Sequence, residues 1–175
     1  MAAKEILLLG NPVLRTICEP VHHFSDAVVQ TTIDDLRDTL ADFKQTHGFG
    51  RGIAAPQIGM TQRIIFIDVD KPLALINPRI THRSRNTMMI WDDCFSFPDI
   101  VVKVERNESI HVEYRDESGT KQTLEAEGGL SELLQHEIDH LDGVLAIDRA
   151  IDSKHIILRS EWEKLVPGEL THQIS

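Results

Sequence analysis

The sequence predicts an α+β fold, and the order of its hydrophobic patterns supports this class. A helical period near the start is followed by several short β-rich runs, and a helical period returns after Gly128-Gly129. Helices and strands are therefore segregated along the chain instead of alternating as βαβ units, which favours short antiparallel or mixed sheets. The length of 175 residues suits one enzyme-sized domain, which we expect to extend over residues 1–175.

The first predicted elements are a turn at Asn11-Pro12 and an amphipathic helix. With Ser25 as N-cap, apolar residues recur at steps of three and four until the helix ends near His47-Gly48. These apolar residues are Val29, Ile33, Leu36, Leu40 and Phe43. Three glycines within residues 48–52 then indicate backbone that turns sharply or approaches another molecule closely.

The middle of the chain predicts strands, and its last third predicts two helices. The expected strands are residues 62–68, 73–80, 88–91, 100–105, 109–115 and 121–126, with a hairpin turn at Glu117-Ser118-Gly119. Leucines from Leu130 to Leu141 predict a second helix that stops at Gly143. Residues 153–165 predict a short amphipathic helix that ends before Pro167-Gly168.

Composition excludes several classes of function. The chain has 18 Lys and Arg against 28 Asp and Glu, so its net charge of −10 disfavours direct binding to nucleic acid. The apolar run at residues 6–9 is too short for a signal peptide or a membrane-spanning helix. We therefore expect an unprocessed cytoplasmic protein without membrane contact, with Cys18 and Cys94 as free thiols.

The strongest chemical signal is His136-Glu137-Ile138-Asp139-His140, an HExxH arrangement. Residues four apart lie on one face of a helix, so both imidazoles can reach one metal ion, while Glu137 can take a proton from attacking water. An exposed helix that happens to carry two histidines is the plainer interpretation.

A catalytic metal of this kind needs a third protein ligand. Ala146 occupies the position where a metzincin has its third histidine, so that class is excluded. Glu161 or Glu163 on the last predicted helix suits a thermolysin-like site. Cys94 is the remaining candidate, although a lone cysteine is more often a small core residue.

Three motifs together resemble the peptide deformylase family over nearly the whole chain. Residues 50–57, Gly-Arg-Gly-Ile-Ala-Ala-Pro-Gln, resemble the family's first motif, Gly-apolar-Gly-apolar-Ala-Ala-x-Gln. Residues 92–96, Asp-Asp-Cys-Phe-Ser, resemble the second, usually Glu-Gly-Cys-Leu-Ser. Residues 135–141, Gln-His-Glu-Ile-Asp-His-Leu, match the third without a change. The resemblance implies short sheets around a central HExxH helix and a single metallohydrolase domain.

The resemblance also implies roles for individual residues. Cys94, His136 and His140 bind one divalent metal ion per chain, typically Fe²⁺, with Zn²⁺ or Ni²⁺ able to replace it. Glu137 acts as general acid and base, and Gln57 and the backbone N–H of Phe95 face the developing oxyanion. Gly50, Arg51, Gly52 and Asp93 contact the substrate, which lies along the first motif like an added strand. The implied activity removes the formyl group from the N-terminal formyl-methionine of newly made polypeptides and releases formate.

The chain departs from the family pattern at Arg51, Asp92, Asp93 and Phe95. Our hypothesis is that Arg51 and Asp93 lie near one another at the cleft and alter substrate recognition, against the plainer view that both face solvent. Two alternative functions stay open at this point. One is a deformylase-like amidohydrolase for another formylated or acylated amine, and the other is a catalytically silent metal-binding homologue.

Some further residues carry weaker expectations. Glu132 is expected to be a solvated residue at a helix start, and Asp139 and Arg106 can form an ion pair. Trp91 and Trp162 are expected to pack in the protein. The balanced charges from Lys154 onward do not favour electrostatic docking of the tail on the ribosome.

Overall fold

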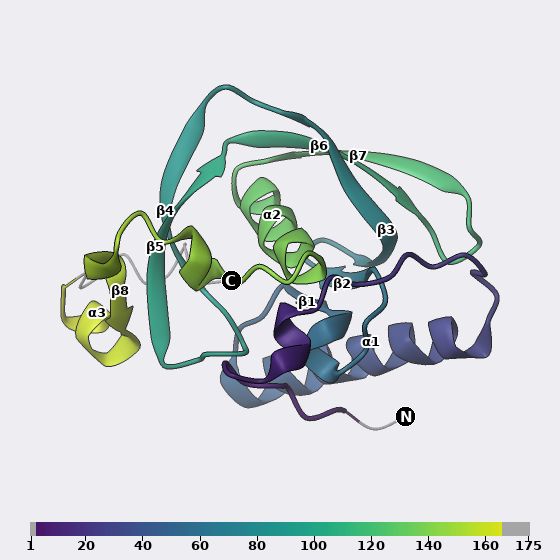
Figure 1. The fold of residues 1–175 in the computed structure, drawn as a ribbon, viewed down its shortest axis with the longest axis horizontal. Helices are drawn as coiled ribbons and strands as arrows, with labels where there is room; N and C mark the ends of the chain where they lie inside the picture. Colours follow the sequence, from purple (N-terminus) through teal and green to yellow (C-terminus); the bar gives the residue numbers. More distant parts are fainter. Residues whose placement is uncertain (1–2, 166–175) are drawn as a thin grey trace.

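The computed structural model describes residues 3–165, which form two antiparallel sheets with a helix between them (Figure 1). The α-helices are α1 (Ala27–His47), α2 (Gly129–Leu141) and α3 (Arg159–Leu165). Four short 3₁₀ helices are η1 (Pro12–Arg15), η2 (Ala55–Ile58), η3 (Ala146–Arg149) and η4 (Ser153–His155). The strands are β1 (Gly52–Ala54), β2 (Ile64–Asp68), β3 (Pro72–Arg83), β4 (Thr87–Asp93), β5 (Ile100–Asn107), β6 (Ser109–Arg115), β7 (Lys121–Glu127) and β8 (Ile156–Leu158). This mixture of helices and antiparallel sheets confirms the predicted α+β class.

The larger sheet has the strand order β1-β2-β3-β6-β7, and every neighbouring pair in it is antiparallel. Strand β1 lies at one edge of this sheet, where Gly52 pairs with Ile67 and Ala54 with Ile65 of β2. The smaller sheet has the order β4-β5-β8. Its strand β4 ends at Asp93, so Cys94 is the first residue after this strand.

Helix α2 is enclosed by both sheets and is buried on nearly all sides (Figure 1). One apolar cluster joins its leucines to the larger sheet, and a second cluster joins α1 to the outer face of β1, β2 and β3. A third cluster surrounds Cys94 with Leu14, Phe97, Val102 and Leu145. A helix buried on all sides can place polar side chains in a site shielded from water.

The structure differs from the expected elements at the start of the first helix, around residues 52–58 and at residues 153–158. Helix α1 begins after Asp26 instead of Ser25, because the carbonyl oxygen of Asp26 accepts the first helical hydrogen bonds, from Val29 and Gln30. Strand β1 was not predicted, because three residues are too few to show a period. The 3₁₀ helix η2 after it was not predicted either. The expected helix at residues 153–165 is wrong in its first half, where β8 pairs with β5.

Most other elements agree with the sequence. Strand β6 has the expected bounds, α2 begins one residue earlier than its first leucine, and Trp162 is buried as a packing residue. Both cysteines are free thiols, as expected. The expected helix end at Pro167-Gly168 lies outside the described residues.

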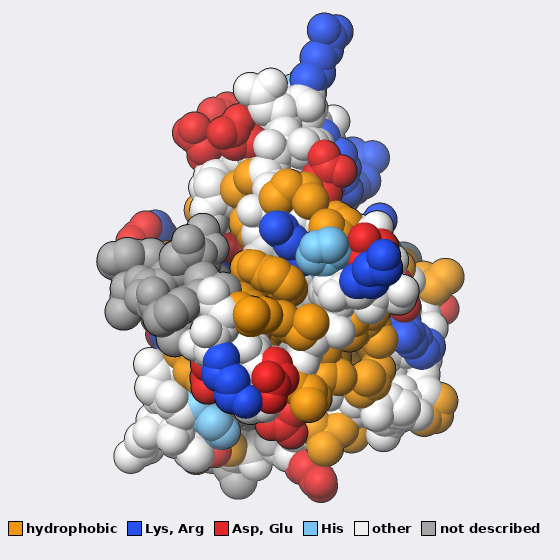
Figure 2. Space-filling view, turned by 90° about the vertical axis from the view of Figure 1, so that its left-hand side faces the viewer, with side chains coloured by type: hydrophobic (Ala, Val, Ile, Leu, Met, Phe, Trp, Pro, Cys, Tyr) orange, Lys and Arg blue, Asp and Glu red, His pale blue; other side chains and the backbone are white. Residues whose placement is uncertain are grey.

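Hydrophobic and charged side chains share the face that carries the smaller sheet and α3 (Figure 2). Large hydrophobic residues that are exposed on these elements include Met89 on β4 and Ile156 and Leu158 on β8. Within residues 3–165, no helix combines the length and the apolar character needed to cross a bilayer.

Candidate metal centre and active site

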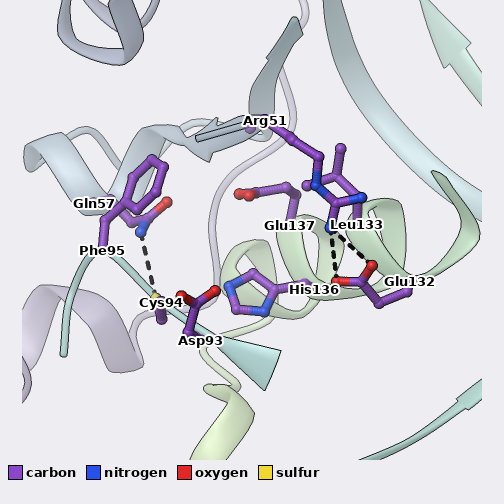
Figure 3. A pocket seen from close by; sticks show the side chains of 10 residues that line it. Arg51, Gln57, Asp93, Cys94, Phe95, Glu132, Leu133, His136 and Glu137 are labelled. Carbon is purple, nitrogen blue, oxygen red and sulfur yellow. Dashed lines mark hydrogen bonds and ion pairs between the residues drawn. The ribbon is translucent and has the colours of Figure 1, made fainter. Parts of the chain in front are cut away.

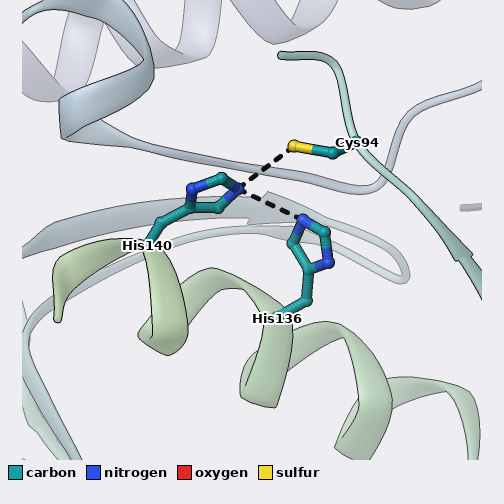
Figure 4. A group of neighbouring side chains, drawn as sticks. All are labelled: Cys94, His136 and His140. Atoms are coloured by element: carbon teal, nitrogen blue, oxygen red, sulfur yellow. Dashed lines mark hydrogen bonds between the residues drawn. The ribbon is translucent and has the colours of Figure 1, made fainter. Parts of the chain in front are cut away.

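Helix α2 and the turn after β4 bring together three side chains that could hold a metal ion (Figure 4). His136 and His140 are four residues apart and therefore share one helix face. Cys94 faces them from a turn in which its carbonyl oxygen accepts a hydrogen bond from Phe97 N. All three residues are buried, with 7%, 1% and 4% of their surface exposed for His136, His140 and Cys94.

The spacing of the donor atoms fits a bound metal ion. Nε2 of His140 lies 3.3 Å from Sγ of Cys94 and 3.2 Å from Nε2 of His136. Tetrahedral bonds to sulfur and nitrogen of ordinary length place ligand atoms about 3.3 to 3.6 Å apart. All three donor atoms lie within 4.8 Å of one another. Two imidazoles and one thiol in this arrangement match the donors that zinc and ferrous iron accept.

A chain of charged side chains, buried except for Arg149, holds the ring of His136. Oδ1 of Asp92 lies 2.9 Å from Nδ1 of His136, so the other ring nitrogen is free to point toward Cys94 and His140. Arg106 donates to Oδ2 of Asp92 at 3.0 Å and also to Asp139. Arg149 donates to Oδ1 of Asp139 at 2.7 Å. The ion pair expected between Asp139 and Arg106 is therefore confirmed, and it belongs to a larger network.

The directions of the pKa shifts at these groups follow from burial and from their charged neighbours. Burial would lower the pKa of His136, but Asp92 and Cys94 hold it well above its usual value. Burial and the neighbouring His136 push the pKa of His140 well below its usual value. Burial raises the pKa of the Cys94 thiol. A thiolate is therefore costly in this site unless a cation balances it, which is the role that a divalent metal fills.

Glu137 lies beside the donor cluster on α2 and is 3% exposed. Its Oε2 is buried without a hydrogen-bond partner in the described part of the chain, so it is available to a molecule that enters the site. Burial raises the pKa of Glu137 to about 7. A Cβ atom at Gly52 would lie 3.0 Å from Oε1 of Glu137, so the glycine leaves room for this carboxylate. Such a carboxylate can accept and return a proton near neutral pH.

Gln57 and Phe95 lie on the opposite side of the pocket from Glu137 (Figure 3). Oε1 of Gln57 accepts a hydrogen bond from Ala54 N at 2.9 Å, which turns the amide Nε2 toward the cluster. That Nε2 lies 3.6 Å from Sγ of Cys94 and 3.3 Å from Oγ of Ser96. The Phe95 ring stacks on Phe43 of α1 at 3.8 Å and fixes the position of its backbone. Ser96 is the last residue of the second motif, but the motif alone assigns it no role; the structure shows that its hydroxyl contacts the Gln57 amide.

Arg51 and Asp93 both line this pocket, but they do not pair with each other. Nη2 of Arg51 lies 2.8 Å from Oε2 of Glu132, while Oδ2 of Asp93 lies 2.5 Å from Nη2 of Arg159. The view that both side chains face solvent is therefore wrong. Glu132 is 7% exposed and paired, so the expectation of a solvated residue is also wrong. The sequence reasoning did not predict the partner of Asp93. A carboxylate placed in the cleft needs a cationic partner, and this requirement could have directed attention to Arg159.

Glu161 and Glu163 are both exposed on α3, and Glu161 pairs with Lys164. Within residues 3–165, Cys94, His136 and His140 are the one group of three possible ligands gathered closely enough for a metal. The alternative of a glutamate from the last helix as third ligand does not agree with this geometry.

Comparison with known proteins gives one consistent family. A family model described as polypeptide deformylase matches residues 3–155. The peptide deformylase of Rhizobium meliloti is 42% identical over 154 residues, which cover 85% of each chain. The peptide deformylase of Thermotoga maritima is 40% identical over 157 residues, which cover 89% of this chain and 92% of that protein.

Solved structures agree with these relatives. A crystal structure of a peptide deformylase from Synechococcus elongatus in complex with actinonin superposes with a TM-score of 0.81 at 35% identity, covering 89% of this chain and 82% of that one. The crystal structure of the Thermotoga maritima peptide deformylase superposes with a TM-score of 0.79 at 38% identity, covering 87% of this chain and all of that one (100%). The fold is therefore that of the solved deformylases.

Proposed function

Because the chain belongs to the peptide deformylase family, metal-dependent hydrolases that remove the formyl group from nascent peptides, we propose that Cys94, His136 and His140 hold its metal ion. The observation that carries this assignment is the convergence of three buried donor atoms within 4.8 Å of one another. The enzyme is accordingly a hydrolase that acts on formylated peptides. We further propose that residues 1–175 act as one metallohydrolase domain in the cytoplasm.

The metal that we propose is Fe²⁺, with Zn²⁺ or Ni²⁺ as replacements that the same donors accept. When bound, a divalent ion polarises the formyl carbonyl and lowers the pKa of water toward neutrality. The Cys94 thiol supports a metal of this group, since both iron and zinc accept a thiolate ligand. Asp92 supports such a site as well, because its contact with Nδ1 of His136 at 2.9 Å leaves the other ring nitrogen to point toward Cys94 and His140.

Glu137 acts as the general base and then as the general acid in this proposal. Its carboxylate takes a proton from water as the water oxygen bonds to the formyl carbon. The same proton then passes to the amine nitrogen as the C–N bond breaks, which yields formate and a free N-terminus. The buried and unpartnered Oε2 of Glu137 supports this role.

Gln57 and the backbone N–H of Phe95 stabilise the negative charge that develops on the formyl oxygen. Nε2 of Gln57 points toward Cys94 at 3.6 Å, so it is directed at the centre of the cluster. Removal of one such donor from a hydrolase costs about 3 to 4 kcal/mol of transition-state stabilisation. Both groups lie in the pocket lining that also contains Glu137.

Gly50, Arg51, Gly52 and Asp93 form the substrate-binding part of this proposal. Strand β1 lies at the edge of its sheet, so an extended peptide can add to it as a further strand. Positive φ at Gly50, 129°, brings the backbone into a conformation that other residues rarely adopt. The polar side chains of Arg51 and Asp93 then face the residue that carries the formyl group.

Two measurements on one preparation test the proposal. Protein purified without oxygen and reloaded with Fe²⁺, Ni²⁺ or Zn²⁺ should release formate from formyl-Met-Ala-Ser and contain one metal ion per chain. Cys94→Ser should lose both the metal and the activity, while Glu161→Gln should keep both. Full metal content in Cys94→Ser would contradict the assigned ligands.

A result with metal but without formate release from formyl-Met-Ala-Ser would favour the other substrates that the sequence leaves open. A panel of other formylated and acylated amines would then separate an altered substrate preference from a silent homologue. We propose nascent chains as the substrate and no electrostatic docking of α3 on ribosomal RNA, since Arg159 and Lys164 are balanced there by Glu161 and Glu163.

A further inference from the structure

The segment formed by β8 and α3 reaches the turn that carries Cys94. Strand β8 pairs with the start of β5, where Ile156 lies opposite Val102 and Leu158 opposite Ile100. The backbone N–H of Arg159 donates to Asp99 O at 2.8 Å, and buried Trp162 anchors α3. The first residue of α3, Arg159, is thereby placed beside residues 93–99.

The side chain of Arg159 contacts both ends of this turn. Its Nη2 lies 2.5 Å from Oδ2 of Asp93, the residue directly before Cys94. Its Nε donates to Pro98 O at 2.7 Å, beyond Cys94 on the other side of the turn. The guanidinium also lies over the ring of Phe49 at 5.8 Å. One planar side chain therefore joins the two ends of the loop that positions the sulfur atom.

The buried carboxylate of Asp93 requires a cationic partner such as Arg159. Its side chain is 9% exposed and lies beside Cys94 and His136 (Figure 3). In the described part of the chain, Arg159 is the cation at ion-pair distance from its carboxylate. A carboxylate buried next to a metal-binding thiolate is unfavourable without such a partner.

We infer that Arg159 is a positioning residue for the metal centre, which fastens the Cys94 turn through Asp93 and Pro98. The inference rests on the proposed role of Cys94 as a ligand. The family model matches residues 3–155, so Asp93 and Pro98 lie inside the matched part of the chain and Arg159 lies beyond it. Groups that orient metal ligands typically contribute about 10- to 100-fold to metal affinity.

Titration of the metal-free full chain with Co²⁺ tests this role without relying on activity. Bound cobalt reports its thiolate ligand through a sulfur-to-metal charge-transfer band in the near ultraviolet. Arg159→Met should weaken Co²⁺ binding by about 10- to 100-fold and reduce or shift this band. Arg159→Lys should recover part of the affinity, because the ammonium can reach Asp93 but cannot make both contacts. Asp93→Asn should stay within about threefold of the parent, since Arg159 can still donate to the amide oxygen.

Lys164→Met is the matched control, because it removes the cation of an exposed ion pair on the same helix. It should leave Co²⁺ affinity and the band unchanged. An unchanged affinity in Arg159→Met, with only a lower unfolding temperature, would overturn the inference and assign Arg159 to tail packing. An equal loss in Lys164→Met would overturn it too.

Cys94→Ser separates this inference from the proposed site. Loss of the charge-transfer band in Cys94→Ser, together with normal binding by Arg159→Met, would overturn the positioning role alone. A band that persists in Cys94→Ser would instead overturn the assignment of Cys94 as ligand.

Discussion

Nη2 of Arg51 lies 3.1 and 2.8 Å from the two carboxylate oxygens of Glu132, within the lining of the pocket beside the candidate metal ligands. The two side chains are 25% and 9% exposed, so the pair is largely removed from water. Nη1 of Arg51 also donates to Gly129 O at 3.0 Å, at the start of α2. Arg51 directly precedes β1 and Glu132 lies on α2, so the pair connects these two elements. It also lines one wall of the pocket with charged side chains.

Arg51→Met should destabilise the fold, because it removes the guanidinium that faces the buried Glu132 carboxylate. We expect a loss of about 1.5 to 3 kcal/mol in the free energy of unfolding, measured with urea. The double variant Arg51→Met/Glu132→Leu should regain most of this loss, since it removes both charges of the pair and leaves neither one buried without its partner. Arg79→Met, which affects a pair with a 74% exposed arginine, is the control and should change stability by less than about 0.5 kcal/mol.

The same double variant should change substrate preference. An apolar wall favours an apolar side chain on the formylated residue, so kcat/KM for formyl-Met-Ala-Ser should rise relative to formyl-Gln-Ala-Ser. A change of about 10-fold in this ratio is the size that one altered pocket contact supplies. An unchanged ratio would show that the side chain of the formylated residue does not meet this wall.

Glu137→Gln should abolish most of the activity while leaving the metal in place. The amide keeps the size of the side chain but cannot carry the proton, so kcat should fall by about 10²- to 10⁴-fold. Steady-state formate release and metal analysis of the same sample measure both effects. Glu163→Gln on exposed α3 is the control. Activity close to that of the parent in Glu137→Gln would assign the proton transfer to another group.

Asp92→Asn should weaken metal binding through His136. The neutral amide removes the charge 2.9 Å from Nδ1 of the ring, and its single oxygen cannot accept from both His136 and Arg106. We expect a loss of about 10- to 100-fold in affinity, measured by competition with a chromophoric chelator. Asp34→Asn, which affects an exposed pair on α1, should bind metal normally. Equal affinities in the two variants would contradict a role for Asp92 in orienting His136.

Gly50→Ala should cost more stability than Gly10→Ala, although both glycines have positive φ. A Cβ at Gly50 would lie 3.0 Å from Cζ of Phe95 and 3.3 Å from Cδ1 of Phe43, whereas at Gly10 it would meet nothing within 4 Å. The backbone strain alone is about 1 to 2 kcal/mol for either substitution. Thermal and urea unfolding of the two variants should therefore show an additional loss at Gly50. Equal losses would mean that the Phe95 ring moves aside freely.

The hydrophobic pattern of the sequence was enough to predict the fold class, and its motifs were enough to predict which residues form the candidate site. Periodicity located α1, α2 and most strands, because long amphipathic segments repeat their apolar residues at the spacing of the element that they form. The spacing of His136 and His140 also required only local geometry, since one helical turn brings both rings to the same face. Motifs of this kind can be interpreted before any tertiary contact is known.

Contacts between side chains far apart in the sequence could not be predicted and became visible in the folded chain. Arg51 pairs with Glu132 and Asp93 with Arg159, over 81 and 66 positions of sequence. No local pattern encodes such contacts, because they depend on how β1, the Cys94 turn, α2 and α3 pack. Strand β8 was missed for the same reason, since its three residues become a strand by pairing with the edge of β5. Burial then turned these charges from solvated residues into parts of the site, because a charge removed from water must find a partner.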